Sequence, residues 1–140
     1  MTGVYDAYAS KLGYENVKLQ MEGEMDRELF AEYVEVEPDP EKSAKVLRTI
    51  RRELGLEAYD AICQAAASWD GRKANAIFRT VVLGLHLPKK KKGMHCLTKD
   101  YVCTVAELSK KTWNEAHSFM GFVRFVELTG GILYADIKPE

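Results

Sequence analysis

The sequence has few of the residues that build metal centres and disulfides. Its 140 residues include only three cysteines and three histidines. No two of them have the C-x2-C or H-x3-H spacing of a zinc site, and three thiols cannot all pair with one another. The sequence therefore predicts neither a metal nor a cofactor. We expect free thiols in a reducing cytoplasm.

Long hydrophobic runs and phosphate-binding glycine loops are also missing. No segment is apolar over the length that crosses a membrane, and the first 13 residues predict an amphipathic helix rather than a signal peptide. No dinucleotide fingerprint or P-loop is present. The composition, 46% hydrophobic and 29% charged, is that of a soluble globular protein with a single domain over residues 1–140.

The chain as a whole is nearly neutral, but its parts are not. The formal net charge is −1, yet residues 1–41 carry 11 acidic and 3 basic side chains, whereas residues 42–124 carry 7 acidic and 16 basic. A basic middle is typical of a nucleic-acid interface. It is equally typical of solvated helices that pair with the acidic N-terminal part. Both interpretations stay open.

Hydrophobic periodicity predicts helices over residues 4–12, 40–54, 57–68, 72–87 and 98–119. Alternation predicts short strands over residues 17–21 and 29–37. Residues 122–128 and 132–138 flank Thr129, Gly130 and Gly131, which predicts a C-terminal β-hairpin. The expected fold class is α+β, with four or five helices packed on one side of a small, largely antiparallel sheet to which the hairpin contributes.

The helix over residues 40–54 is the strongest candidate for phosphate contacts. Asp39 can cap it and Pro40 suits its first position. Ala44, Leu47, Ile50 and Leu54 predict its buried stripe, and the basic residues cover the opposite face. The full set of predicted nucleic-acid contacts is Lys45, Arg48, Arg51, Arg52, Lys89, Lys90, Lys91, Lys92, Lys110 and Lys111.

The hairpin has two plausible registers. A two-residue turn would place Arg124 on an apolar face, whereas a three-residue loop places it opposite Asp136. We expect the three-residue loop, because it gives the Arg124 charge a carboxylate partner. Arg124 then either forms a cross-strand ion pair or binds a phosphate or another ligand.

The segment NEAHSFMGFVRFVEL followed by GGILYADIKP resembles domain-of-unknown-function family 4130. The resemblance extends upstream through GVYDAYASKLGYENVKL and AYDAICQAAAS, and so covers nearly the whole chain. It implies a role in DNA metabolism beside a radical-SAM partner protein. Fuller-length members are longer at both ends, so the resemblance implies a domain core without an N-terminal strand and a C-terminal segment. The motif positions are Asn114, Glu115, His117, Gly121, Phe122, Arg124 and Phe125.

Three functions follow as hypotheses. The first is a DNA-repair or DNA-modification accessory that binds nucleic acid through the basic residues. The second is a small hydrolase or glycosylase-like enzyme that uses Glu115, His117 and Arg124, although Glu115 and His117 lie two residues apart and should point to different faces of a helix. Asn114, His117, Arg124 and Tyr134 would instead line a pocket at the helix-to-strand junction. The third is a protein-interaction module that docks the radical-SAM partner.

Overall fold

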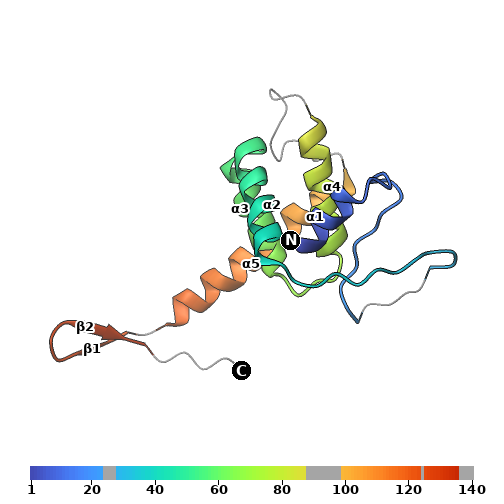
Figure 1. The fold of residues 1–140 in the computed structure, drawn as a ribbon. Helices are drawn as coiled ribbons and strands as arrows, with labels where there is room; N and C mark the ends of the chain where they lie inside the picture. The colour runs from blue at the N-terminus through green and yellow to red at the C-terminus, as the bar shows by residue number, and fades with distance from the viewer. Residues whose placement is uncertain (24–27, 88–98, 124, 136–140) are drawn as a thin grey trace.

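A computed structural model describes residues 1–23, 28–87, 99–123 and 125–135 of the chain. These residues form five helices and one antiparallel β-hairpin (Figure 1), which confirms the α+β class. The elements are α1 (Thr2–Ala9), α2 (Pro40–Glu53), α3 (Leu56–Ala67), α4 (Lys73–His86), α5 (Asp100–Phe122), β1 (Val126–Leu128) and β2 (Ile132–Tyr134).

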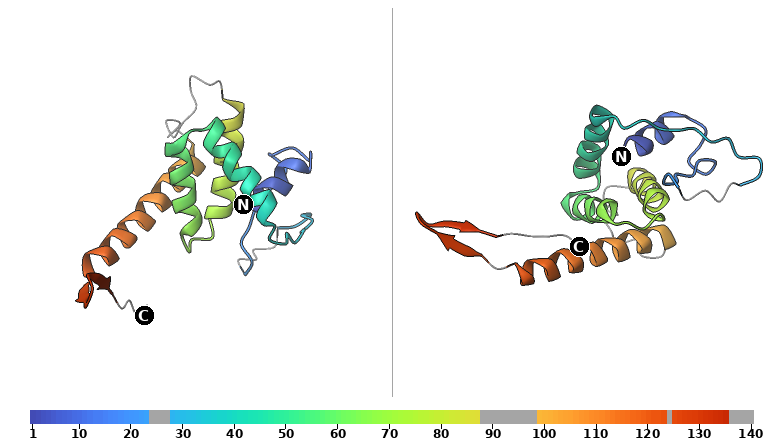
Figure 2. Two further views of the ribbon diagram at one scale, coloured as in Figure 1. Left: turned by 60° about the vertical axis from the view of Figure 1, so that its left-hand side comes forward. Right: turned by 90° about the horizontal axis from the view of Figure 1, so that it is seen from below.

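The helices form three layers around one core. Figure 2 shows α3 and α4 lying between α5 on one side and α1 and α2 on the other. Each layer contributes to the core, whose largest fully buried side chains are Phe78, Ile50, Ile62, Leu108 and Val105. The hydrophobic periodicity predicted these helices because each of them has one apolar face.

The start of α2 is held by a polar cluster that includes α1. The Asp39 carboxylate accepts hydrogen bonds from the backbone N–H groups of Glu41 and Lys42, at 2.8 and 3.1 Å, which confirms the predicted cap. The buried Thr2 hydroxyl accepts a bond from the Asp39 N–H at 2.9 Å and lies 3.1 Å from the Ser43 hydroxyl. These contacts fix where α2 begins and how it is oriented.

Two predicted strands are absent from the part of the chain that the structure describes. Neither residues 17–21 nor the described part of residues 28–39 contains strand structure, and Phe30 has a left-handed φ of 64°. A strand needs a neighbouring backbone to pair with. The described hairpin lies on the far side of the helices from residues 28–39 (Figure 1), so the alternating pattern finds no sheet to join.

Helix boundaries and one buried stripe also differ from the prediction. The first helix ends at Ala9, before Lys11 with its φ of 57°, and the last helix continues to Phe122. In α2 the buried stripe contains Val46 and Ile50, whereas Ala44 is exposed. Packing of α2 against α1 and α3 selects the larger side chain, because burying valine removes more apolar surface from water.

The hairpin has the predicted three-residue loop but not the predicted packing. Val126 pairs with Tyr134 and Leu128 with Ile132, which confirms the register. The expected pair of Arg124 with Asp136 lies outside the described residues. The helices pack on one another rather than on a sheet, and every residue of both strands is exposed.

Candidate functional site

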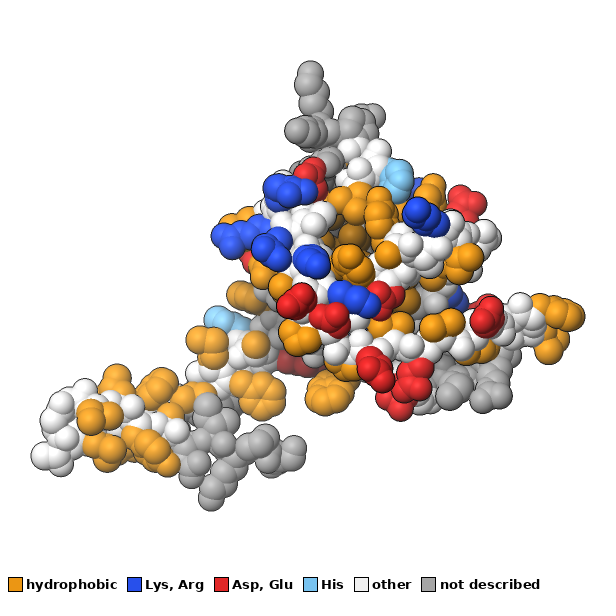
Figure 3. All heavy atoms as spheres, viewed as in Figure 1, with side chains coloured by type: hydrophobic (Ala, Val, Ile, Leu, Met, Phe, Trp, Pro, Cys, Tyr) orange, Lys and Arg blue, Asp and Glu red, His pale blue; other side chains and the backbone are white. Residues whose placement is uncertain are grey.

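The outer face of α2 carries a basic row, which we define as Lys45, Arg48, Arg51 and Arg52. All four side chains are exposed. Lysine and arginine side chains gather over the side of the bundle where α2 lies (Figure 3). The helix places them there because Val46 and Ile50 on its opposite face are buried.

The members of the basic row differ in how far their charges are neutralised. The Arg52 Nε donates to the Glu53 carboxylate at 2.9 Å. The Arg48 Nε donates to the backbone carbonyl of Ala44 at 3.3 Å, a contact without a counter-charge. Lys45, Arg48 and Arg51 make no ion pair with any carboxylate in the described ranges. Three cations of the row are therefore available to an anionic ligand.

A second feature is a shallow, open groove along one side of α5, with a volume of about 560 Å³. Every lining residue comes from α5, at the three- and four-residue spacings of one helix face. It contains Asn114 and Glu115, two of the motif positions. The lining residues are Glu107, Lys110, Lys111, Asn114, Glu115, Ser118 and Phe119.

The imidazole of His117 lies outside the groove, against an indole. The rings of Trp113 and His117 are stacked, with centroids 4.9 Å apart and an angle of 7° between their planes. Both side chains are exposed. Glu115 lines the groove, so the expectation that Glu115 and His117 point to different faces is confirmed. The structure does not bring these two side chains together as an acid/base pair.

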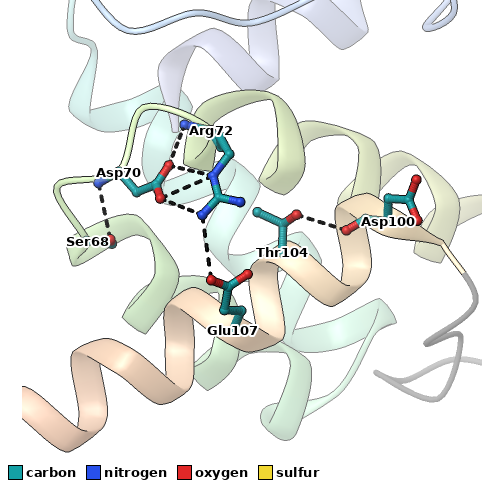
Figure 4. Close-up of polar contacts among 6 residues, drawn as sticks. All are labelled: Ser68, Asp70, Arg72, Asp100, Thr104 and Glu107. Carbon is teal, nitrogen blue, oxygen red and sulfur yellow. Dashed lines mark hydrogen bonds and ion pairs between the residues drawn. The ribbon is translucent and has the colours of Figure 1, made fainter.

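The loop between α3 and α4 is tied to α5 by an ionic bridge (Figure 4). The Arg72 Nη2 lies 2.7 Å from the Asp70 carboxylate and 3.6 Å from that of Glu107. The Arg72 guanidinium lowers the pKa of the Asp70 carboxyl, and in turn Asp70 raises the pKa of Arg72. Trp69 in this loop is 98% exposed.

The predicted basic residues form separate zones rather than one face. Lys110 and Lys111 are exposed on α5, which is separated from α2 by the α3/α4 layer (Figure 2). The lysines at 89–92 and Arg124 lie outside the described residues. Of the remaining motif positions, Gly121 and Phe125 are exposed. Of the predicted pocket residues Asn114, His117 and Tyr134, the α5 groove contains Asn114 alone.

Sequence reasoning missed how far the C-terminal part of the chain is exposed. Apolar side chains cover the hairpin (Figure 3), each between 47% and 65% exposed. Their alternation predicted a hairpin but gave no sign of whether helices would cover it. The exposed members are Phe125, Val126, Leu128, Ile132, Leu133 and Tyr134.

The described residues contain neither a cluster of metal ligands nor a helix suited to span a membrane. No group of three or more histidine, cysteine, aspartate or glutamate side chains among them is placed to hold a metal ion. The His86 Nδ1 instead lies 2.7 Å from the Val82 carbonyl oxygen. No helix in the described part of the chain has both the length and the apolar character of a membrane span.

Comparison with known proteins adds a family but no activity. Neither the search of curated proteins nor the search of solved structures found a match. The model of a domain of unknown function, DUF4130, matches residues 71–140, which hold α4, α5 and the hairpin. This match covers half of the chain and includes the groove and the Trp113–His117 stack. The chain therefore belongs to the DUF4130 family.

Proposed function

We propose that the protein is a nucleic-acid-binding accessory of DNA metabolism, and that the basic row on α2 contacts the phosphate backbone. The observation that carries the proposal is that Lys45, Arg48 and Arg51 are exposed and make no ion pair within the described residues. Uncompensated cations on one helix attract a polyanion regardless of its sequence.

The anchoring of α2 supports this proposal. Its first turn is capped by Asp39 and bonded through Thr2 to α1, and its inner face is buried in the core. Such a helix presents its cations at fixed spacing, so little backbone entropy is lost on binding. Phosphate contacts of this kind position a ligand but do not read its sequence. Lys110 and Lys111 on α5, and the lysines at 89–92, are proposed to extend the contact.

The test is a comparison of two variants that remove the same charge. Arg48→Gln/Arg51→Gln acts on the basic row, and Lys11→Gln/Lys99→Gln removes two exposed cations elsewhere. Binding of a labelled DNA oligonucleotide is followed by fluorescence anisotropy at low salt. The first variant should weaken binding about tenfold or more, whereas the second should change it little. Equal losses would mean that only net charge matters, and the basic row would then have no special role.

A second candidate is protein interaction through the hairpin. A two-stranded hairpin is marginally stable alone in water, and this one exposes six large apolar side chains. A covering partner would stabilise it and bury that surface. We propose a protein partner, and the family resemblance implies a radical-SAM protein.

Co-purification of the two co-expressed proteins tests this candidate. Val126→Glu/Leu133→Glu places a charge on each face of the hairpin and should abolish co-purification. Leu56→Glu, at another exposed leucine, is the matched control and should leave it intact. Unchanged recovery with the hairpin variant would exclude the hairpin as the contact. Self-association of the single protein would identify a second copy as the occupant instead.

The enzyme hypothesis receives less support from the geometry. Catalysis by Glu115, His117 and Arg124 requires these groups to converge around a substrate. Glu115 lines the α5 groove, His117 stacks on Trp113 outside it, and Arg124 lies outside the described residues. We therefore do not propose a hydrolytic reaction.

A further inference from the structure

We infer that a strip on α5, defined as Lys110, Trp113 and His117, binds an unpaired nucleotide of single-stranded nucleic acid. The inference rests on the proposed function and names its ligand class more closely. The base would stack on the Trp113–His117 ring pair, and the adjoining phosphate would contact Lys110. Stacking of bases on exposed aromatic rings, together with nearby cations, is how proteins hold single strands without reading their sequence.

The ring pair has the geometry of a stacking platform. The two planes are within 7° of parallel and their centroids are 4.9 Å apart, so the rings stack on each other and each has one face turned away from its neighbour. Trp113 is 52% exposed, and His117 is exposed as well. Residues four apart on a helix lie one above the other, which is why the rings meet. A base added to this pair continues a stack that already exists.

The cation beside the platform is Lys110 rather than Lys111. Lys110 precedes Trp113 by three residues and Asn114 by four, so it lies between the ring pair and the groove. Lys111 has Glu107 four residues before it and Glu115 four residues after it, and both carboxylates line the groove with it. These carboxylates offset the Lys111 charge. Lys110 has a single carboxylate one helical turn away, that of Glu107, and this carboxylate also faces the Arg72 guanidinium.

Double-stranded nucleic acid fits this strip poorly. In a duplex the base faces are already stacked on one another, so the ring pair finds no partner without unstacking. The basic row on α2, by contrast, would contact the phosphates of either form. The two surfaces lie on opposite sides of the α3/α4 layer, so a short oligonucleotide occupies one at a time. The strip therefore predicts a preference for single strands that the basic row does not.

The test measures binding of a short oligothymidylate and of a short duplex by the full chain. Trp113→Ala and His117→Ala should each weaken oligothymidylate binding about 5- to 100-fold and leave duplex binding unchanged. His117→Phe should restore it, because the second ring returns. Lys110→Gln should weaken it, and by more than Lys111→Gln does, because carboxylates flank Lys111 on both sides. Trp69→Ala is the control for any exposed indole and should have no effect, since Trp69 lies outside the strip.

The outcomes separate the inference from the proposal on which it rests. If Trp113→Ala leaves oligothymidylate binding unchanged, or Trp69→Ala weakens it equally, the inference is overturned. If the Arg48→Gln/Arg51→Gln variant weakens duplex binding in the same series, the proposed role of α2 survives that failure. If the α2 variant has no effect while Trp113→Ala abolishes single-strand binding, the proposed role of α2 fails and the strip stands. Unaltered circular dichroism of each variant confirms its folding.

Discussion

Thr2→Val is expected to destabilise the protein through the loss of one buried hydroxyl. That hydroxyl accepts the Asp39 N–H at 2.9 Å, donates to the Asp39 carbonyl at 3.2 Å and lies 3.1 Å from the Ser43 hydroxyl. Valine has nearly the same shape, so packing is retained while the Asp39 N–H loses its partner at the start of α2. An unsatisfied donor at this part-buried position costs about 1–3 kcal/mol, which for a chain of this size lowers Tm by about 3–10 °C.

Thr104→Val is the matched control. The Thr104 hydroxyl donates only to the Asp100 carbonyl within its own helix, at 2.9 Å, and the bond is exposed to water. Solvent can replace it, so the expected change in Tm is within about 2 °C. Thermal unfolding followed by circular dichroism compares the two variants directly. Equal losses of Tm would show that the contact between α1 and α2 adds nothing beyond a local hydroxyl bond.

Three further changes probe other contacts. Phe78→Ala removes a fully buried ring and should lower the free energy of unfolding by about 3–5 kcal/mol in urea titration. Gly84→Ala would place a Cβ 2.6 Å from the Leu54 Cδ2, so it should destabilise the wild type by about 1 kcal/mol but not the Leu54→Ala variant. Asp70→Asn removes a carboxylate whose pKa in the folded protein lies below its ordinary value of 3.8, so it should lower Tm at pH 6. The difference from wild type should vanish as the pH falls from 3.8 through the lowered pKa, and a difference that persists at lower pH would contradict the ionic bridge.

Local signals in the sequence were enough to place α2. Asp39 and Pro40 mark its start, the basic residues recur on one face, and the structure confirms both features. Val46 rather than Ala44 is buried because neighbouring helices decide which edge of the apolar face turns inward. The identity of a helix is thus a local property, whereas its rotation depends on residues distant in the sequence.

Strand prediction failed where a partner was needed. Residues 29–37 alternate as a half-buried strand does, but alternation gives only a tendency, and the energy of a sheet comes from backbone pairing. The C-terminal hairpin carries its partner strand three residues away, so its register followed from loop length and charge. Its exposure did not follow, since no local signal says whether another element will cover it.

The candidate site was predictable in composition but not in layout. The spacing of Lys45, Arg48 and Arg51 placed them on one exposed face, as the structure shows. Two helices separate this face from Lys110 and Lys111, and that arrangement depends on tertiary packing. The exposure of Trp69 depends on tertiary packing too. The Trp113–His117 stack was accessible from the sequence as two aromatic rings four residues apart on a helix.

The salt dependence of DNA binding shows whether the basic row on α2 contacts phosphates. Each phosphate contact contributes about 0.9 to the slope of log K against log salt for duplex DNA. We expect a steep slope for the wild type and a slope smaller by about 2 for Arg48→Gln/Arg51→Gln. Identical slopes for the two proteins, or no binding to DNA at low salt, would contradict this expectation.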